Sequence, residues 1–370
     1  MKDFSYWELQ TWFKNVDFCI IGSGIVGLNC ALSLREQNPK AKIIVLDKGI
    51  LPKGASTKNA GFSCFGSISE IVADLKVHSE QEVIDLVRKR WDGVQLLKAR
   101  LGEKAIGYQN NGGYEVFFNQ EDFQNSLDHL DRVNKMLDEV FPSAPFHVYP
   151  NRFEFENCAN DYIGSLFEGQ INTGEMMKRL IYIAQSKEIQ LLYGMEVQSY
   201  TQLQNKVQIH TSEGDFYSSK LLIATNGFAS QMFEDDIKPA RAQVMITKPI
   251  DNLKIKGVFH MDEGYYYFRN VENRILIGGA RNLDFKAEKT TVFDTTDPII
   301  NQLHKVLIDI ILPHTPYEID HQWSGIMGVG KQKGPIVKAL SDDVYCGVRL
   351  GGMGVAIGSA VGAQLASLVH

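Results

Sequence analysis

The sequence predicts an α/β fold with two sheets, and three observations support this prediction. An apolar strand, a glycine-rich turn and a helix follow one another over residues 16–37, and a second apolar strand follows at 42–49. Residues 241–249 and 264–280 have the pattern of antiparallel strands in another sheet. Residues 342–369 repeat the order of strand, glycine turn and helix. The apolar strands indicate a buried parallel sheet, and the others a second, antiparallel one.

The elements between these patterns are expected in a simple order. A long helical region precedes two strands that flank a further helix, and another helix leads into a polar hairpin that turns at Glu213 and Gly214. A buried strand then ends in a glycine turn, and a last helix stops before Pro313. The expected ranges are helix 68–100, strand 112–118, helix 121–140, strand 146–150, helix 173–189, strand 191–200, strand 220–228 and helix 297–311.

Composition narrows the class of protein. The chain has 370 residues, of which 44% are hydrophobic and 22% charged, and this length is enough for two globular domains. The formal charge is -6 with no basic block, so we expect neither nucleic acid nor an anionic membrane as a partner. Five scattered cysteines without a CxxC pair indicate reduced thiols and a cytoplasmic location. The nine histidines lack HxxxH and HExxH spacing, which predicts no metal site.

The two ends of the chain raise the question of a membrane. The first 15 residues carry acids and two tryptophans but no apolar core, so they are not expected to be a signal peptide. Residues 350–369 have no charge over about one bilayer-spanning length, and Gly354, Gly358 and Gly362 would form a packing face in lipid. The Gly and Ser content, Gln364 and the missing basic flanks favour a buried, closely packed helix. We therefore expect no transmembrane span.

The turn Gly22-Ser-Gly24-Ile-Val-Gly27 is the first functional signal. In such a turn the first glycine allows a tight bend, the second lets the backbone approach a pyrophosphate, and the third lets helix and strand pack closely. The helix N-terminus then offers free N–H groups to the phosphates. The second strand ends at Asp47, where a carboxylate would accept the ribose hydroxyls and disfavour a 2′-phosphate. This pattern predicts a dinucleotide, and by itself leaves NAD and FAD open.

An ordered set of motifs favours FAD. VDFCIIGSGIVGLNCALSL, VLDKG, GASTKNAGF, LLIATNGF, ARAQVMITKP, GYYYFRNVENRILIGGA, HQWSGIMG and GVRLGGMGVAIGSAVGAQLA occur in this order over nearly the whole chain. The chain thereby resembles the D-amino-acid oxidase/glycine oxidase/sarcosine oxidase (DAO) family of FAD-dependent oxidoreductases. Its opening SYWE is similar to the branch with γ-glutamylputrescine oxidases.

The resemblance implies a Rossmann-like FAD domain of the GR2 type and a second α+β domain with a large antiparallel sheet. The FAD domain would comprise residues 1–76, 151–237 and 319–370, and the substrate domain residues 77–150 and 238–318. It also implies a set of residues in contact with FAD. These are Gly22, Ser23, Gly24, Ile25, Val26, Asp47, Lys48, Ser56, Thr57, Asn59, Ala60, Gly61, Val197, Thr225, Asn226, Gly227, Gly325, Gly351, Gly352, Met353 and Gly354.

Several residues common in the family are replaced here. The arginine that holds a substrate carboxylate after Trp-x-Gly corresponds to Met327. The lysine that sarcosine-oxidase-like members carry in the last glycine motif is also missing, and no cysteine lies near 325–328. We therefore expect non-covalent FAD, and a substrate that is not an ordinary small amino acid bound in the usual way.

Other residues could serve the substrate. Arg281 or Arg269 could bind an acid, with a structural role as the alternative. Tyr266 and Tyr267 are neighbours on a strand, so their side chains point to opposite faces and only one can face a cavity. We predict Tyr266, Arg281 and Lys58 as the catalytic residues. Lys58 lies within residues 56–61, which the resemblance places against FAD, and its positive charge could tune N5 of the flavin or activate dioxygen.

Two further features of the sequence are not expected to contribute to catalysis or to nucleoside triphosphate binding. His260 is expected to be structural rather than catalytic. The segment GIMGVGKQ, residues 325–332, fits GxxxxGK but lacks the following Ser or Thr, so we do not expect a nucleoside triphosphate there.

The expected function is FAD-dependent oxidation of the C–N bond of an amine or amino acid. Hydride would go to flavin N5, the imine would hydrolyse in water, and dioxygen or an electron carrier would accept the electrons. Three alternatives remain. They are a FAD-dependent 2-hydroxy-acid or glycerol-phosphate oxidase or dehydrogenase, an NAD-dependent dehydrogenase, and a flavin-binding protein without catalysis.

Overall fold

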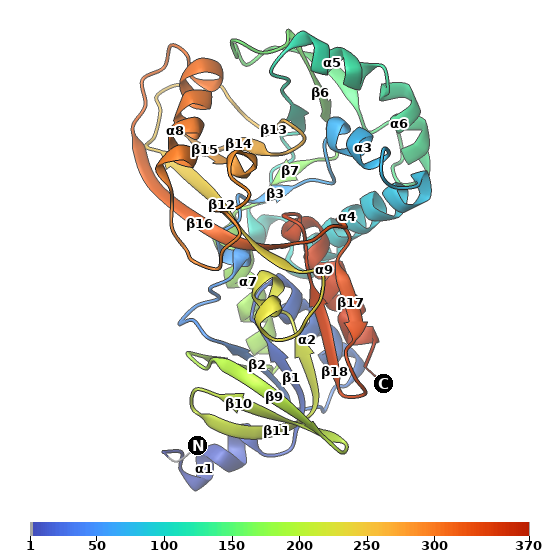
Figure 1. Ribbon diagram of the computed structural model, residues 1–370, viewed down its shortest axis with the longest axis vertical. Helices are drawn as coiled ribbons and strands as arrows, with labels where there is room; N and C mark the ends of the chain where they lie inside the picture. The colour runs from blue at the N-terminus through green and yellow to red at the C-terminus, as the bar shows by residue number, and fades with distance from the viewer. Residues whose placement is uncertain (1–2, 370) are drawn as a thin grey trace.

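The computed structural model describes residues 3–369; residues 1, 2 and 370, at the outer ends of the predicted FAD-domain segments, lie outside the described residues. Two large sheets occupy opposite ends of the long axis (Figure 1). Each sheet has its own apolar core. Both sheets were expected from the sequence, and they are present.

The first sheet has a parallel centre. Its strands run in the order β17-β18-β11-β1-β2-β8, and only β17 at the edge is antiparallel to its neighbour. Both faces of the centre are buried, which explains why β1 and β2 are apolar except for Asp17 near the start of β1 and Asp47 at the end of β2. The bounds are β1 Val16–Ile21, β2 Ile43–Asp47, β8 Gln190–Tyr193, β11 Gly214–Ile223, β17 Ile336–Ala339 and β18 Val344–Val348.

A small antiparallel layer grows out of the same sheet. The first half of β11 pairs with β10 (Lys206–Thr211), and β10 pairs with β9 (Val197–Leu203). The second half of β11 continues between β1 and β18. The expected hairpin turn at Glu213 and Gly214 joins β10 to β11, and Val197, at the start of β9, pairs with Thr211 at the end of β10.

Helix α9 (Gly354–Ser367) packs between α2 (Ile25–Gln37) and α4 (Glu80–Leu101). Small residues permit this approach: a Cβ added to Gly362 would lie 2.6 Å from the carbonyl oxygen of Val26, and Gly93 of α4 lies against the backbone of Ala356. The expected buried helix is thus confirmed. Within residues 3–369, every helix is too short or too polar to cross a bilayer.

The second sheet is mixed. Its order is β16-β12-β15-β14-β13-β4-β6-β5, and only β13 and β4 are parallel. Helix α8 (Asp297–Val306) covers one face and joins the aromatic core there, while the other face turns toward the first sheet. The bounds are β4 Gly113–Glu115, β5 His147–Pro150, β6 Asp161–Ser165, β12 Lys238–Thr247, β13 Val258–Met261, β14 Tyr266–Val271, β15 Arg274–Gly279 and β16 Ile319–Val329.

Two of the expected long helices are divided, and a third changes from an α-helix to a π-helix at its end. The helix predicted over 68–100 is two helices, because Ser79 and Glu82 form a capping box that starts a new helix. The helix predicted over 121–140 also breaks, and the one over 297–311 ends in a π-turn. The remaining bounds are α1 Tyr6–Glu8, α3 Ile68–Asp74, α5 Gln120–Leu127, α6 Leu130–Met136 and α7 Thr173–Ser186, with the short pair β3 Phe62–Ser63 and β7 Gly169–Gln170.

Strand pairing divides the chain differently from the predicted domain boundaries. Strand β16, inside the predicted FAD segment 319–370, pairs with β12 over its whole length and so belongs to the second sheet. Strand β6 also joins the second sheet, whereas α4 packs against α9 near the first. The division into two domains stays a prediction. If strand pairing decides the boundaries, β16 and β6 would move from the predicted FAD domain to the second domain.

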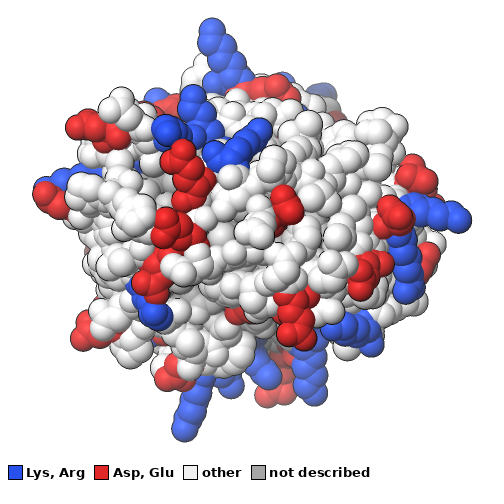
Figure 2. All heavy atoms as spheres, turned by 90° about the horizontal axis from the view of Figure 1, so that it is seen from above, with Lys and Arg blue, Asp and Glu red and all other residues white. Residues whose placement is uncertain are grey.

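The surface carries both signs of charge. Figure 2, seen from above, shows Lys and Arg interspersed with Asp and Glu, and no large basic patch on this face. That nucleic acid is not a partner stays a prediction.

Candidate active site

A cavity of about 810 Å³ lies between the two sheets. It begins at the carboxyl ends of β1 and β2 and reaches the face of the second sheet formed by β12, β14 and β16. Ligands of open α/β sheets bind at such carboxyl ends, and this volume is typical of a ligand site.

The glycine turn has the geometry that the sequence predicted. Gly22 has a φ of +102°, and a Cβ there would lie 2.8 Å from the carbonyl oxygen of Ala224. A Cβ on Gly27 would overlap the carbonyl oxygen of Gly22, so this position holds helix and strand together. The N-cap residue of helix α2 is Gly24, which has no side chain, and the first residues of the helix line the cavity. The Ile25 N–H donates to the Ser56 hydroxyl, and the positive end of the helix faces the cavity, where it can meet an anion.

Asp47 fixes this turn from the end of β2. Its Oδ2 accepts from the backbone N–H of Ser23 at 3.0 Å and from the Ser23 hydroxyl at 2.7 Å, and its Oδ1 accepts from Gly49 N–H at 3.0 Å. The neighbouring Lys48 pairs with Glu196 at 3.5 Å and lies 4.6 Å above the ring of Phe228. The carboxylate thus lines the cavity in a fixed orientation, as ribose binding requires.

The segment 54–61 follows the cavity wall. The Ser56 hydroxyl accepts from Ile25 N–H at 2.9 Å, which ties this segment to the start of α2. Asn59 donates to the Ser56 carbonyl at 2.8 Å and accepts from Gly61 N–H at 2.8 Å. Trp323 of β16 donates to the carbonyl of Lys58 at 2.9 Å. These bonds connect the segment to helix α2 and to the second sheet.

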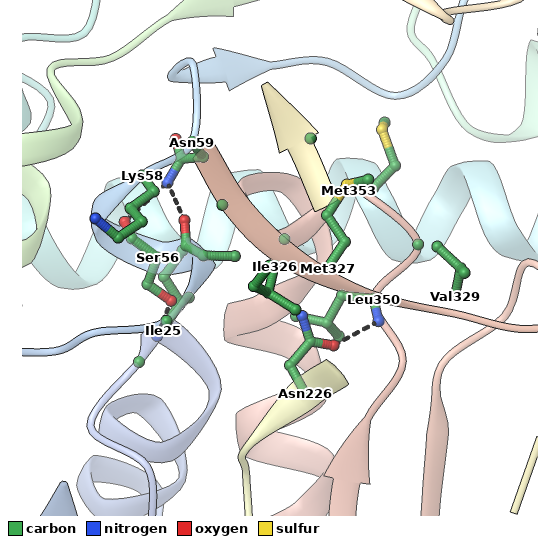
Figure 3. Close-up of a pocket in the computed structure, with 18 of the residues that line it drawn as sticks. Ile25, Ser56, Lys58, Asn59, Asn226, Ile326, Met327, Val329, Leu350 and Met353 are labelled. Atoms are coloured by element: carbon green, nitrogen blue, oxygen red, sulfur yellow. Dashed lines mark hydrogen bonds between the residues drawn. The ribbon is translucent and has the colours of Figure 1, made fainter. Parts of the chain in front are cut away.

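The opposite wall contains the C-terminal glycine turn. In Figure 3, Asn226, Met327, Leu350 and Met353 lie across the cavity from Ser56 and Lys58. The side-chain oxygen of Asn226 accepts from Leu350 N–H at 3.2 Å and so fixes the turn that precedes α9. The first residues of α9 line the cavity, so the N-terminus of this helix is directed toward it.

Most of the predicted cofactor-binding residues line this cavity. Ser23, Thr57 and Gly227 are the exceptions: Ser23 is buried against Asp47, Thr57 donates to the carbonyl of Pro52, and Gly227 packs on the backbone of Met327. Thr225 lines the cavity, and its buried hydroxyl has no hydrogen-bond partner among the described residues. The predicted residues that line it are Gly22, Gly24, Ile25, Val26, Asp47, Lys48, Ser56, Asn59, Ala60, Gly61, Val197, Thr225, Asn226, Gly325, Gly351, Gly352, Met353 and Gly354.

The polar groups along this wall of the cavity fit a dinucleotide. An open helix N-terminus, an oriented carboxylate and a buried hydroxyl without a partner follow one another along the wall. Their individual contacts with a cofactor stay predictions.

The structure corrects one of the three catalytic candidates. Arg281 and Lys58 line the cavity, but Tyr266 does not: its side chain lies in the aromatic core on the opposite face, with Phe118. The strand alternates, so Tyr267 faces the cavity instead. Burial raises the pKa of Tyr267 to about 12 and lowers the pKa of Arg281.

The arginine question also has a structural answer. Arg269 is 6% exposed and lies behind Gly61 rather than in the cavity, and burial lowers its pKa to about 10. Met327, at the position of the family's arginine, lines the cavity. Arg281 is therefore the candidate that can reach an anion there.

Sequence reasoning missed a polar group beside the second sheet. His260, Glu70 and Asp74 line the cavity, and Lys333 pairs with Asp74 at 2.6 Å. Glu70 and Asp74 lie in α3, which no functional motif marks. Only the strand alternation that also places Tyr267 could have drawn attention to His260.

Cys64, Glu168 and His260 bring ligand-type atoms within 4.8 Å of one another. The hydrogen bond between Glu168 and His260 explains this proximity, and burial raises the pKa of the Cys64 thiol, which keeps it neutral. The absence of a metal site stays a prediction.

Comparison with known proteins identifies the family. The model of the family "FAD dependent oxidoreductase" (DAO) matches residues 17–368. The chain belongs to the DAO family. It is an enzyme, a FAD-dependent oxidoreductase, as the motifs suggested.

The relatives are distant but cover nearly the whole chain. A probable oxidoreductase OrdL of Haemophilus influenzae is 21% identical over 100% of this chain and 86% of its own. The γ-glutamylputrescine oxidoreductase of Escherichia coli is 22% identical over 96% and 83%. A glycine oxidase structure from Bacillus cereus has a TM-score of 0.76 at 18% identity, covering 96% of this chain and 97% of that one. The family resemblance and the fold are thus confirmed.

Proposed function

We propose that this enzyme oxidises the C–N bond of an amine or amino acid. Bound FAD would accept the hydride, and the imine would then hydrolyse in water. The γ-glutamylputrescine oxidoreductase and glycine oxidase among the similar proteins support this class of substrate.

One observation carries the proposal. The cavity is continuous from the nucleotide turn to the second sheet, where Val244, Tyr267 and Met327 line it with largely apolar surface. A substrate there would lie against the flavin end of the cofactor, away from bulk water. Positioning in such a site contributes much of the rate of a hydride transfer.

The residues of this end receive separate roles. Arg281 would bind an anionic group of the substrate, since Met327 cannot. Tyr267 would limit the width of the pocket, and Lys58 would supply positive charge near the reacting end. The residues on the nucleotide wall listed above would hold FAD without a covalent bond. Acid precipitation should then release the flavin into the supernatant.

The test is an anaerobic absorption spectrum of the FAD-loaded enzyme with separate pools of amines, amino acids and 2-hydroxy acids. Bleaching of the 450 nm region with amines or amino acids is expected. Arg281→Gln should then raise KM for acids but leave simple amines unaffected, with Lys286→Gln on the nearby surface as the control. Absence of bleaching with every amine and amino acid would reject the proposal. Admitting dioxygen afterwards separates an oxidase from a dehydrogenase.

A second candidate is oxidation of a 2-hydroxy acid. An L-2-hydroxyglutarate dehydrogenase of Escherichia coli is 22% identical over 57% of this chain and 47% of its own length. Bleaching only with the hydroxy-acid pool would favour this candidate. For both candidate functions we propose dioxygen or an electron carrier as the electron acceptor, and a cytoplasmic location.

A further inference from the structure

A histidine–carboxylate pair lies at the substrate end of the cavity. His260 is directly opposite Tyr267 in the register of β13 and β14, so the two side chains share the face that lines the cavity. The Nε2 of His260 donates to Oε2 of Glu168 at 3.2 Å, and Oε1 of Glu168 accepts from Phe65 N–H at 3.0 Å. The two side chains are 9% and 3% exposed. With its proton on Nε2, the ring keeps Nδ1 as an acceptor.

The surroundings of His260 favour proton uptake. Burial alone would lower the pKa of His260, but the hydrogen bond to Glu168 and the charges of Glu168, Glu115 and Glu70 raise it above the usual value. Phe62 meets the ring edge-on at 5.4 Å. The facing groups come from five other segments: Cys64 in the chain after β3, Glu70 in α3 with its partner Arg90 from α4, Glu115 in β4 and Glu168 before β7.

Other ionisable groups of the cavity are poorer bases. The pKa of Tyr267 is raised to about 12, and a guanidinium such as that of Arg281 stays protonated. Lys333 pairs with both Glu70 and Asp74, at 3.7 Å and 2.6 Å. Among these groups, His260 is the one that can exchange a proton near neutral pH. Burial also raises the pKa of Glu115 to about 6, but Glu115 does not line the cavity.

We propose that His260 is a catalytic residue, which takes the proton from the ammonium form of the substrate, and that Glu168 is its positioning residue. The inference rests on the proposed amine oxidation. One N–H bond breaks, its electron pair stays on nitrogen, and the proton binds Nδ1 of His260. The neutral amine then loses hydride from its α-carbon to the flavin, which is the oxidant, and the nitrogen lone pair forms the C=N bond of the protonated imine.

The test compares the pH dependence of flavin reduction in the wild-type enzyme, His260→Asn and Glu168→Gln. The probe is the amine that bleaches the wild-type flavin fastest. Loss of a positioned base costs about 10²–10⁴-fold, so His260→Asn should be slower by that factor at pH 7. The deficit should shrink toward the pKa of the amine, where the free base enters directly. His304→Asn is the control, since His304 bonds to Tyr317 behind the second sheet and does not line the cavity.

A second measurement does not depend on activity. Ring ¹³C-labelled histidine would be titrated by NMR in the FAD-loaded enzyme, with the His260 signal assigned by its loss in His260→Asn. The signal should titrate above pH 6.5 in the wild type and at lower pH in Glu168→Gln, since the carboxylate charge is gone.

Four outcomes would overturn the inference. One is an equal deficit of His260→Asn at every pH, which indicates a structural role. Another is a His260 ring that does not titrate between pH 5 and 9. The third is stoichiometric metal that His260→Asn loses, which makes the ring a ligand. The fourth is that amines bleach the flavin equally fast in the wild-type enzyme and in His260→Asn, in which case only this inference fails. If no amine bleaches the flavin of the wild-type enzyme, the proposed function fails as well.

Discussion

Replacement of Gly22 by alanine should destabilise the protein and weaken FAD binding. A residue with a side chain at a φ of +102° costs about 1–3 kcal/mol. Its Cβ would lie 2.8 Å from a backbone oxygen of Ala224, and a forced backbone shift costs about 1–3 kcal/mol more. Unfolding entropy of about 2.1 cal/mol/K per residue gives about 0.8 kcal/mol per kelvin for 370 residues. The apoprotein should therefore melt roughly 3–8 °C lower.

The assay is differential scanning fluorimetry of apoprotein, followed by titration with FAD. Affinity should fall at least tenfold, or about 1.4 kcal/mol, because the shift moves the turn that meets the pyrophosphate. Gly54→Ala is the matched control: Gly54 also lines the cavity, its φ is -77°, and an added Cβ there has no atom within 4 Å. If Gly22→Ala melts and binds FAD as Gly54→Ala does, the account of the turn is wrong.

Three further predictions concern other parts of the molecule. Asp47→Ala should weaken FAD binding at least tenfold, since charge-assisted hydrogen bonds contribute about 1.5–3 kcal/mol each and Asp47 orients the turn; unchanged flavin fluorescence quenching would contradict this. Tyr267→Ala should change KM or the rate of bleaching more than tenfold, whereas Tyr266→Phe should leave both unchanged because it faces the core; the reverse order would contradict the assignment of faces. Glu288→Gln should cost about 3–5 kcal/mol of stability, because it leaves Arg241 buried without its charged partner at 2.7 Å. The exposed pair of Lys248 and Glu318 is the control, and Glu318→Gln should not move the melting temperature; equal melting of both variants would refute the role of burial.

The nucleotide-binding half could be predicted because its signals are local. The turn from Gly22 to Gly27, Asp47 and the small residues of α9 each act on chain segments next to them or on a backbone that only glycine can approach. Sequence spacing records such constraints directly. The breaks within long helices were missed for a related reason: the capping box at Ser79 is a local signal that apolar periodicity hides.

The substrate end could not be predicted in the same way, because it is assembled by long-range pairing. The choice between Tyr266 and Tyr267 depends on which face of β14 the core covers, and that face is set by α8, about 30 residues further along the chain. The contact between His260 and Glu168 spans 92 residues, and it requires β13 and the segment before β7 to meet at one edge of the cavity. A one-residue shift in the register of β13 would turn His260 into the aromatic core and Phe259 into the cavity. The sheet that fixes this register therefore also decides which base faces the flavin end, and the pH profile of His260→Asn tests that register as well as the chemistry.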